Sequence, residues 1–519
     1  MFICVGRNCL KFGAWILKIF TIFSQNLIFK SLTIPIMKGI TKKEFIFSIF
    51  ILSTLFGFYP FSTSFAQNSD KAKPNVIVIF TDDQGYGDLS SFGHPNIRTP
   101  NLDKMVDEGQ KWTNFYVAAS VCTPSRAGLI TGRYPIRSGM ASDVHRVLFP
   151  DSKGGLPAEE ITIAEQVKKA GYQTAMIGKW HLGHHEQYLP TNHGFDYYYG
   201  IPYSNDMDQS EDNPQRGNYI NGYFEFADDH IPIEYYNVPL MRNTEIIERP
   251  ADQNTITRRF TEESISFIEK HHDQPFFLLL AHSLPHIPLF ASEEFIGRSD
   301  AGLYGDVIEE IDHGVGLIID KLNELEIAER TLVVFTSDNG PWLVFKTHGG
   351  SAGLLRAGKG TTWEGGMRVP AIFWWPGSIN PEIVTDIGST MDIFTTVSHL
   401  AGVPIPDDRI VDGVNLTPVL MSDGESPRKE MLFYRGATVY AARKDNFKAH
   451  FIIEGAYGQF EAKQVLETPL LYDLSTDPGE KYDIAENYPE IIAEIKEMVK
   501  RHQQYLVKVK DQLAERESN

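Results

Sequence analysis

Cysteine is nearly absent from this chain, with three residues in 519. Two of them, Cys4 and Cys9, lie in the first ten residues, and Cys122 is the third. If the N-terminal segment is removed, Cys122 is the only thiol left and cannot form an intramolecular disulfide. Outside the reducing cytosol, such a residue pairs with another molecule, stays free and reactive, or is chemically converted. The residues around Cys122 favour conversion.

Basic residues are also in short supply. The chain has 48 Lys and Arg against 67 Asp and Glu, a formal net charge of -19. Nucleic acids and anionic membranes select basic surfaces, so we expect neither as a partner. The hydrophobic fraction of 42% indicates a globular protein with a large core. Any anionic substrate must therefore be attracted by local charges.

Residues 1–66 are typical of a targeting segment. Three lysines precede an apolar run at 45–61, and the small residues at 64–66 match a secretory cleavage site. The run is short for a membrane span, so we expect cleavage after Ala66 and no stable membrane insertion afterwards. A start at Met37 gives a signal peptide of ordinary length. We therefore expect an exported protein, periplasmic or secreted.

Beyond this segment, short apolar runs alternate with helical patterns, which is typical of a largely parallel sheet flanked by helices. Buried strands are expected at 75–80, 174–177, 276–280 and 332–335, and helices at 161–169 and 306–325. From about residue 430 the pattern changes to antiparallel strands at 438–443 and 447–453. A final amphipathic helix follows, with an apolar stripe formed by Ile491, Ile492, Ile495, Met498 and Val499. We predict a large α/β domain over 67–429 and a small domain over 430–519.

Polar side chains follow two of the predicted strands. Asp82 and Asp83 follow the strand at 75–80, and Asp338 and Asn339 follow the strand at 332–335. Ligands of open α/β sheets bind beyond the carboxyl ends of strands. Clustered carboxylates repel unless a cation neutralises them, and oxygen ligands suit Ca²⁺ or Mg²⁺ better than Zn²⁺. Taken alone, each pair is equally explained as a turn or a helix cap.

Cationic and histidine side chains follow other strands. Lys179 and His181 follow the strand at 174–177, His286 follows the strand at 276–280, and Lys359 lies in a glycine-rich segment. Together with a metal they indicate an anionic ligand. A single lysine is more often a solvated surface group, and a single histidine a structural one. The histidines near 181 do not have the HExxH spacing of a zinc site.

Cys122 precedes a predicted helix at 125–131. Pro124 can occupy its first turn, which places residue 122 at the helix N-terminus. The helix dipole there favours developing negative charge, whether on an alkoxide or on a thiolate.

The segment Cys122-Thr123-Pro124-Ser125-Arg126 resembles the Cys-x-Pro-x-Arg signature of type I sulfatases. In that family a dedicated maturation enzyme oxidises the cysteine to Cα-formylglycine. Further blocks follow in the family's order: DDQGYGD at 82–88, GKWHLG at 178–183, TSDNG at 336–340 and YDLSTDPGE at 472–480. The closest likeness is to the arylsulfatase A branch, through segments 200–204, 353–362 and 447–451. That branch, like the alkaline-phosphatase superfamily, has a large mixed sheet between helices and a small C-terminal antiparallel sheet.

The resemblance implies a metal site and a converted nucleophile. One Ca²⁺, with Mg²⁺ as the second choice, would be held by Asp82, Asp83, Asp338 and Asn339. It would also touch Cys122 in its converted form, 3-oxoalanine (formylglycine). One hydroxyl of the hydrated aldehyde would attack sulfur while the substrate alcohol leaves. The other would lose its proton and expel sulfate, which regenerates the aldehyde.

The resemblance also implies roles for the surrounding side chains. Arg126 would stabilise the formylglycine alkoxide, with Lys179 and His181 nearby. His286 and Lys359 would bind sulfate and assist the departing oxygen. By position in the pattern, the substrate contacts would be His145, Ser204, Asn205 and His450.

Two departures from the arylsulfatase A pattern stand out. Ala357 replaces a cysteine, so the core must be held without disulfides. Residues 206–242 do not match the branch and are expected to form loops over the site. The resemblance to the arylsulfatase A branch therefore does not identify the substrate of this protein.

Three functions remain open from sequence. The first is an exported Ca²⁺-dependent sulfatase acting on a sulfated carbohydrate, such as algal ulvan or glycosaminoglycan oligosaccharides. The second is a phosphomonoester or phosphonate hydrolase built on the same frame. The third is a non-catalytic glycan-binding protein in which Cys122 is never converted by the formylglycine-generating enzyme.

Overall fold

The computed structural model describes residues 73–517, except 215, 217–219, 221–222, 224–230 and 423. It also describes two short strands, β1 (Cys4–Val5) and β2 (Asn8–Cys9), which pair antiparallel. Residues 71–519 form one compact unit and residues 1–70 another. Apart from β1 and β2, the predicted targeting segment lies outside the described residues. Among the described residues, none of the helices has the length and apolarity needed to cross a bilayer.

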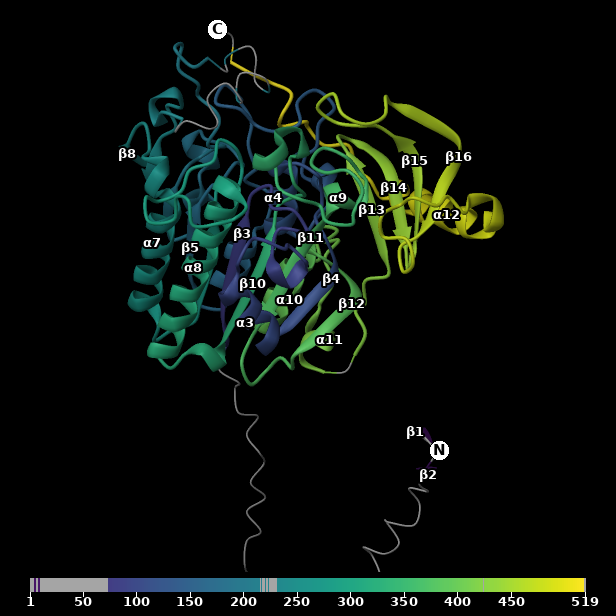
Figure 1. Cartoon of the computed structure of the whole chain (residues 1–519), viewed down its shortest axis with the longest axis horizontal. Coiled ribbons are helices and arrows are strands. Elements are labelled where there is room, and N and C mark those ends of the chain that lie inside the picture. The colour runs from purple at the N-terminus through teal and green to yellow at the C-terminus, as the bar shows by residue number, and fades with distance from the viewer. Residues whose placement is uncertain are drawn as a thin grey trace, which may run out of the picture. The chain divides into compact units, whose positions relative to one another are not determined.

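A ten-stranded mixed sheet forms the centre of the larger unit (Figure 1). Its middle strands run parallel in the order β10, β3, β9, β5, and nearly all of their residues are buried. Their bounds are β10 (Thr331–Ser337), β3 (Asn75–Thr81), β9 (Phe276–Ala281) and β5 (Gln173–Gly178). All four predicted strands are confirmed. Their central residues are apolar because helices cover both faces of the sheet.

The remaining strands extend this sheet at both edges. On the β10 side lie β11 (Arg368–Trp374), β4 (Gln110–Tyr116) and β12 (Glu382–Ser389). On the β5 side lie β6 (Tyr197–Gly200), β7 (Leu240–Arg242) and β8 (Glu245–Glu248). The antiparallel pairing of β11 with both β10 and β4 makes the sheet mixed, as predicted.

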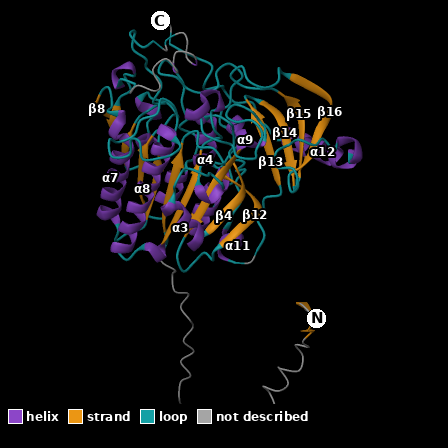
Figure 2. Ribbon diagram, viewed as in Figure 1, coloured by secondary structure: helices purple, strands orange, loops and turns teal. Residues whose placement is uncertain are grey.

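Helices pack on both faces of the sheet (Figure 2). Alternate residues of β3 enter two separate cores, Val76 and Val78 in one and Ile77 and Ile79 in the other. The first core includes residues of α4 (Cys122–Thr131), α5 (Ile163–Lys168) and α10 (Thr390–Leu400). The second includes residues of α3 (Pro100–Glu108), α7 (Ile256–His271) and α8 (Gly302–Glu324). Helices α5 and α8 confirm the two predicted helices.

A second, four-stranded antiparallel sheet follows along the chain. Its strands are β13 (Glu430–Arg435), β14 (Thr438–Lys444), β15 (Phe447–Ile453) and β16 (Gln464–Asp473). Helix α12 (Pro489–Gln504) packs on β14 and β15 with Ile492, Ile495 and Met498 buried. The predicted strands and apolar stripe are confirmed, and so is the fold class. The domain boundary at residue 430 stays a prediction, because residues 71–519 form one compact unit. Two short helices, α9 (Glu364–Met367) and α11 (Thr417–Met421), also belong to the larger unit.

Candidate active site

The four predicted metal ligands meet at the carboxyl ends of β3 and β10. Parallel pairing sets Thr81 beside Ser337, so the residues that follow them are neighbours. The backbone N–H of Asp83 donates to Asp338 Oδ1 at 3.1 Å, and Asn339 Nδ2 donates to Asp83 Oδ1 at 2.7 Å. All four side chains are buried. The structure therefore brings the four predicted residues together.

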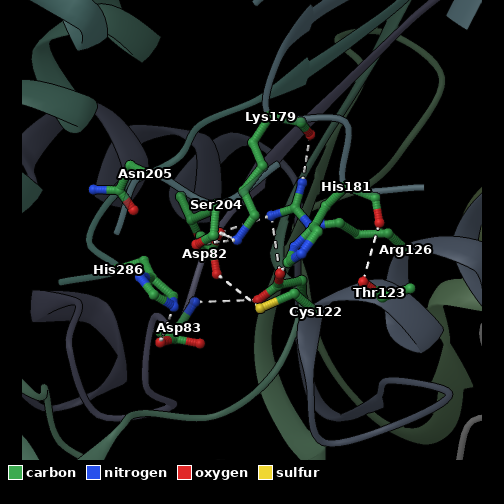
Figure 3. A network of polar contacts seen from close by, with 12 residues as sticks. Asp82, Asp83, Cys122, Thr123, Arg126, Lys179, His181, Ser204, Asn205 and His286 are labelled. Atoms are coloured by element: carbon green, nitrogen blue, oxygen red, sulfur yellow. Dashed lines mark hydrogen bonds and ion pairs between the residues drawn. The ribbon is translucent and has the colours of Figure 1, made fainter. Parts of the chain in front are cut away.

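The N-terminus of α4 brings Cys122 to this cluster. The helix begins at Cys122 and has Pro124 in its first turn, as predicted. The thiol donates to Asp82 Oδ1 at a Sγ to O distance of 3.6 Å (Figure 3). Ligand atoms of Cys122, Asp82, Asp83 and His286 all lie within 4.8 Å of one another. Burial, and then Asp82, raise the pKa of the Cys122 thiol, so the unmodified thiol is a weak nucleophile here.

Three buried cations neutralise the carboxylates. Lys179 donates to Asp82 Oδ2 and, at 3.0 Å, to Ser204 Oγ (Figure 3). Arg126 Nη2 lies 3.2 Å from Asp82 Oδ2 and 2.9 Å from Asp338 Oδ2. Lys359 Nζ donates to Asp83 Oδ2 at 2.8 Å. Each carboxylate thus has at least one cationic partner.

The carboxylates differ in how readily they ionise. Burial raises the pKa of Asp83 to about 7, opposed by Lys359 and reinforced by Asp82. Burial, and then Asp82, raise the pKa of Asp338 to about 6. Although burial opposes it, Lys179 and then Arg126 hold the pKa of Asp82 well below its usual range. Full ionisation of this cluster is therefore costly without an additional positive charge.

Two neutral histidines flank the cluster. Burial, and then Lys359, lower the pKa of His286, whose Nδ1 donates to the Ile287 carbonyl at 2.6 Å. Its Nε2 is 3.5 Å from Asp83 Oδ2. Burial, and then Lys179, lower the pKa of His181, whose Nε2 donates to the Leu148 carbonyl at 2.9 Å. Both rings face the cluster with one nitrogen free of a proton.

A cavity of about 530 Å³ opens above Cys122. Six of the predicted residues line it, namely Cys122, His181, His286, Lys359, His145 and Ser204. Part of the predicted loop segment does so too, through residues 206–209 and Ile220. The segment is not loop throughout, since it also contains a 3₁₀ turn at 233–235 and β7.

Two predicted substrate contacts lie elsewhere. Asn205 Nδ2 donates to Gln253 Oε1 at 3.2 Å and to the Pro288 carbonyl at 3.1 Å, so it braces the loop beneath Ser204. His450 is fully buried, with Nε2 2.6 Å from Glu480 Oε1 and its ring stacked on Trp363. The structure does not bring His450 to the cavity, because Glu480 and Trp363 hold it within the small sheet.

The lining residues that the sequence did not predict include Arg146, Trp342, Tyr457 and Arg516. Trp342 lies three residues after the Asp338-Asn339 motif and Arg146 directly after His145, so proximity to a motif could have suggested both. Tyr457 and Arg516 have no such local signal.

The cluster fits a hard divalent cation. Asn339 Oδ1 is buried and has no hydrogen-bond partner within the described residues. It belongs to the residue whose Nδ2 already binds Asp83. A buried amide oxygen of this kind is costly unless a donor or a cation meets it. Carboxylate and amide oxygens are ligands that Ca²⁺ and Mg²⁺ prefer.

Two family models match this chain. One described as "Sulfatase" matches residues 74–403, and one described as "C-terminal region of aryl-sulfatase" matches residues 426–519. The chain is 40% identical to arylsulfatase A of Homo sapiens over 457 residues, covering 82% of this chain and 87% of that protein. It is 38% identical to N-acetylgalactosamine-6-sulfatase of Homo sapiens over 480 residues, covering 85% and 87%.

A solved structure shows the same fold. The PsFucS1 sulfatase from Pseudoalteromonas sp. superposes with a TM-score of 0.73 at 28% identity. The match covers 91% of this chain and 96% of that one.

Proposed function

Because the chain belongs to the sulfatase family and is a sulfuric ester hydrolase, we propose that it removes sulfate from sulfated carbohydrates after conversion of Cys122 to formylglycine and with one Ca²⁺. The observation that carries this proposal is the position of Cys122. It lies at a helix N-terminus, against three carboxylates and three cations, on the floor of one cavity. Conversion makes the formylglycine-generating enzyme a partner during maturation.

Charge balance supports the metal. The three aspartates and the cations Arg126, Lys179 and Lys359 cancel formally, so a divalent ion would leave the site positive. Asp82, Asp83, Asp338 and Asn339 would hold this ion, and it would stabilise negative charge on the sulfate oxygens. A local positive charge of this kind allows a protein of net charge -19 to receive an anion.

The raised thiol pKa supports conversion of Cys122. Hydrated formylglycine would supply a hydroxyl nucleophile at a position where the thiol is protonated. Arg126 is one turn along α4 and directs its guanidinium to the same carboxylates, so it can stabilise an oxyanion at residue 122. Lys179 and His181 complete this side of the site.

Lys359 and His286 face the cavity from the other side. Although burial opposes it, Asp83 raises the pKa of Lys359, which therefore stays charged and donates to sulfate. His286 Nδ1 is fixed on the Ile287 carbonyl, which aims Nε2 at the reacting group. We assign to this pair the binding of sulfate and assistance to the departing oxygen. His286 takes this role in its protonated form, which the negative charge of a bound sulfate favours.

The residues of the cavity wall support a carbohydrate as the alcohol part of the sulfate ester. Trp342 and Tyr457 lie side by side with ring centroids 4.9 Å apart. Aromatic faces combined with a few polar groups are typical of small-molecule sites, and they suit a sugar ring. His145 and Ser204 are the proposed polar contacts. A relative of this chain is named for sulfate removal from N-acetylgalactosamine.

Comparing sulfate and phosphate esters tests the proposal. We expect kcat/KM for an aryl sulfate to exceed that for the matching aryl phosphate, and Cys122→Ala to abolish both activities. A panel of sulfated algal and glycosaminoglycan oligosaccharides then identifies the sugar. A strong preference for the phosphate ester would instead support a phosphomonoester or phosphonate hydrolase.

The predicted targeting segment supports export. N-terminal sequencing of protein recovered from the periplasm or medium should begin at Gln67. Recovery of the full N-terminus in the membrane fraction would contradict cleavage.

A further inference from the structure

After α12, the last part of the chain packs against the segment between α4 and α5. Residues 506–517, the C-terminal strap, lie along residues 139–154. Gln512 N donates to the Gly139 carbonyl at 2.9 Å, and Glu517 N donates to the Asp151 carbonyl at 2.7 Å. Leu513 is fully buried in the core beneath. The strap is therefore an integral part of the fold (Figure 1).

Two glycines make room for the strap backbone. A Cβ at Gly139 would lie 2.1 Å from the Lys510 carbonyl oxygen, and one at Gly154 would lie 1.9 Å from that of Gln512. Neither distance is compatible with a side chain, and the obstacle in each case is backbone. Glycine at these two positions therefore allows the strap backbone to pack against residues 139–154.

The strap delivers Arg516 to the wall of the Cys122 cavity. Its guanidinium lies 4.1 Å from the centre of the Phe149 ring, and Nη2 donates to His145 Nδ1 at 3.4 Å. Nη1 is 3.5 Å from Asp151. Nε is buried and without a hydrogen-bond partner in the part of the chain that the structure describes. Arg516 thus retains donor capacity beside the cavity.

Arg146 supplies a second guanidinium to the same wall. It is exposed and lies 4.9 Å from the centre of the Tyr457 ring. No carboxylate of the described residues lies within 4 Å of it. Asp206 and Asp208 also line the cavity, but Asp208 is paired with Arg249 at 2.5 Å. The chemistry assigned to Cys122 uses neither Arg146 nor Arg516.

We propose that Arg146 and Arg516 form a subsite for a second anionic group of the substrate, apart from the sulfate that is cleaved. The inference rests on the proposed function, and it narrows the substrate class to carbohydrates with at least two negative groups. Guanidinium groups bind sulfate and carboxylate alike through paired N–H donors. The second group is therefore a sulfate or a uronate carboxylate.

Three disaccharides with the same cleavable sulfate test the subsite. One carries a second sulfate, one a uronate carboxylate, and one no second charge. Binding is measured by calorimetry and turnover by sulfate release, for wild type, Arg146→Ala, Arg516→Gln and Arg516→Lys. Each uncharged variant should reduce the preference for a doubly charged disaccharide about tenfold, mainly through KM, as expected for one charge-assisted hydrogen bond. Arg516→Lys should retain part of the preference for a doubly charged disaccharide.

Lys508→Ala is the matched control, because Lys508 is an exposed cation on the same strap outside the cavity lining. It should leave the preference within twofold of wild type. The disaccharide affected most identifies the second group as sulfate or carboxylate. Equal affinity of wild type, Arg146→Ala and Arg516→Gln for the doubly charged disaccharides would overturn the subsite, whatever the turnover. Arginine-dependent binding without any turnover by wild type would confirm the subsite and overturn the proposed hydrolysis.

Discussion

Arg126 Nε donates a hydrogen bond to Asp338 Oδ2 at 3.0 Å, and both side chains are buried. The two residues lie on α4 and just beyond β10, far apart in the sequence. Because Cys122 is one turn before Arg126 on the same helix, this pair holds the nucleophile position against the carboxylate cluster. In the proposed mechanism, positioning of the nucleophile and binding of the metal therefore both depend on Asp338.

Asp338→Asn keeps the side-chain shape and removes the charge. It should weaken Ca²⁺ binding and reduce kcat/KM by about 100-fold or more, since a metal ligand and the partner of Arg126 are lost together. Calorimetric titration with Ca²⁺ and steady-state kinetics measure the two effects. Asp107→Asn, an exposed position on α3, is the control. Full activity of wild type in excess chelator would refute the metal assignment.

Lys359→Ala removes a cation from the cavity side of the site. We expect kcat to fall about 100-fold, because Lys359 is proposed to stabilise charge that develops on sulfate. The far-ultraviolet circular dichroism should stay unchanged. Lys359→Arg, which keeps the charge, should restore part of the rate. An unchanged kcat in the alanine variant would remove Lys359 from the mechanism.

A buried ionic cluster joins the two sheets. Lys448 on β15 lies 2.9 Å from Glu364 of α9 and 3.0 Å from Glu480, all fully buried. Although burial opposes it, Lys448 and then Arg368 hold the pKa of Glu364 at about 2. Lys448→Met would leave two buried carboxylates short of a partner and should cost about 3–5 kcal/mol of unfolding free energy.

Urea denaturation measures this cost. Lys444→Met is the matched control, because Lys444 lies on the neighbouring strand β14 and pairs with Glu494 near the surface. It should leave the unfolding midpoint close to that of wild type. Similar losses in both variants would show that the cluster does not connect the sheets energetically.

We expect His282 to make the free energy of unfolding depend on pH. It follows β9, and burial lowers its pKa to about 4. Because the folded-state pKa lies below the unfolded value, its contribution is complete above about pH 6.5 and is lost as the pH falls through 4. The loss amounts to about 3 kcal/mol at most. His282→Phe should flatten the decline in urea midpoint between pH 6.5 and 4, whereas exposed His313→Phe should not.

Much of the site could be predicted because local patterns determine it. The run at 76–80 is apolar throughout, which indicates a central strand. Its parallel pairing with the strand at 332–335 brings Asp82 next to Asp338. Pro124 marks the helix start that positions Cys122. These features depend on residues close in sequence to the strands and helices that carry them.

The cavity wall could not be predicted in the same way. Arg516 reaches it only because Gly139 and Gly154 allow the strap backbone to approach, and no periodicity in residues 506–517 indicates this contact. His450 shows the opposite case. Its place in the sequence pattern suggested a substrate contact, but Glu480 binds it inside the small sheet.

Mass spectrometry of the tryptic peptide 112–126, from protein purified from its native host, tests most directly the proposal that Cys122 is the precursor of the nucleophile. The aldehyde is lighter than the thiol, so conversion is read from the peptide mass. We predict that the active protein carries the aldehyde and that sulfate release scales with its fraction. A peptide that retains only the thiol, in protein that still releases sulfate, would contradict the mechanism.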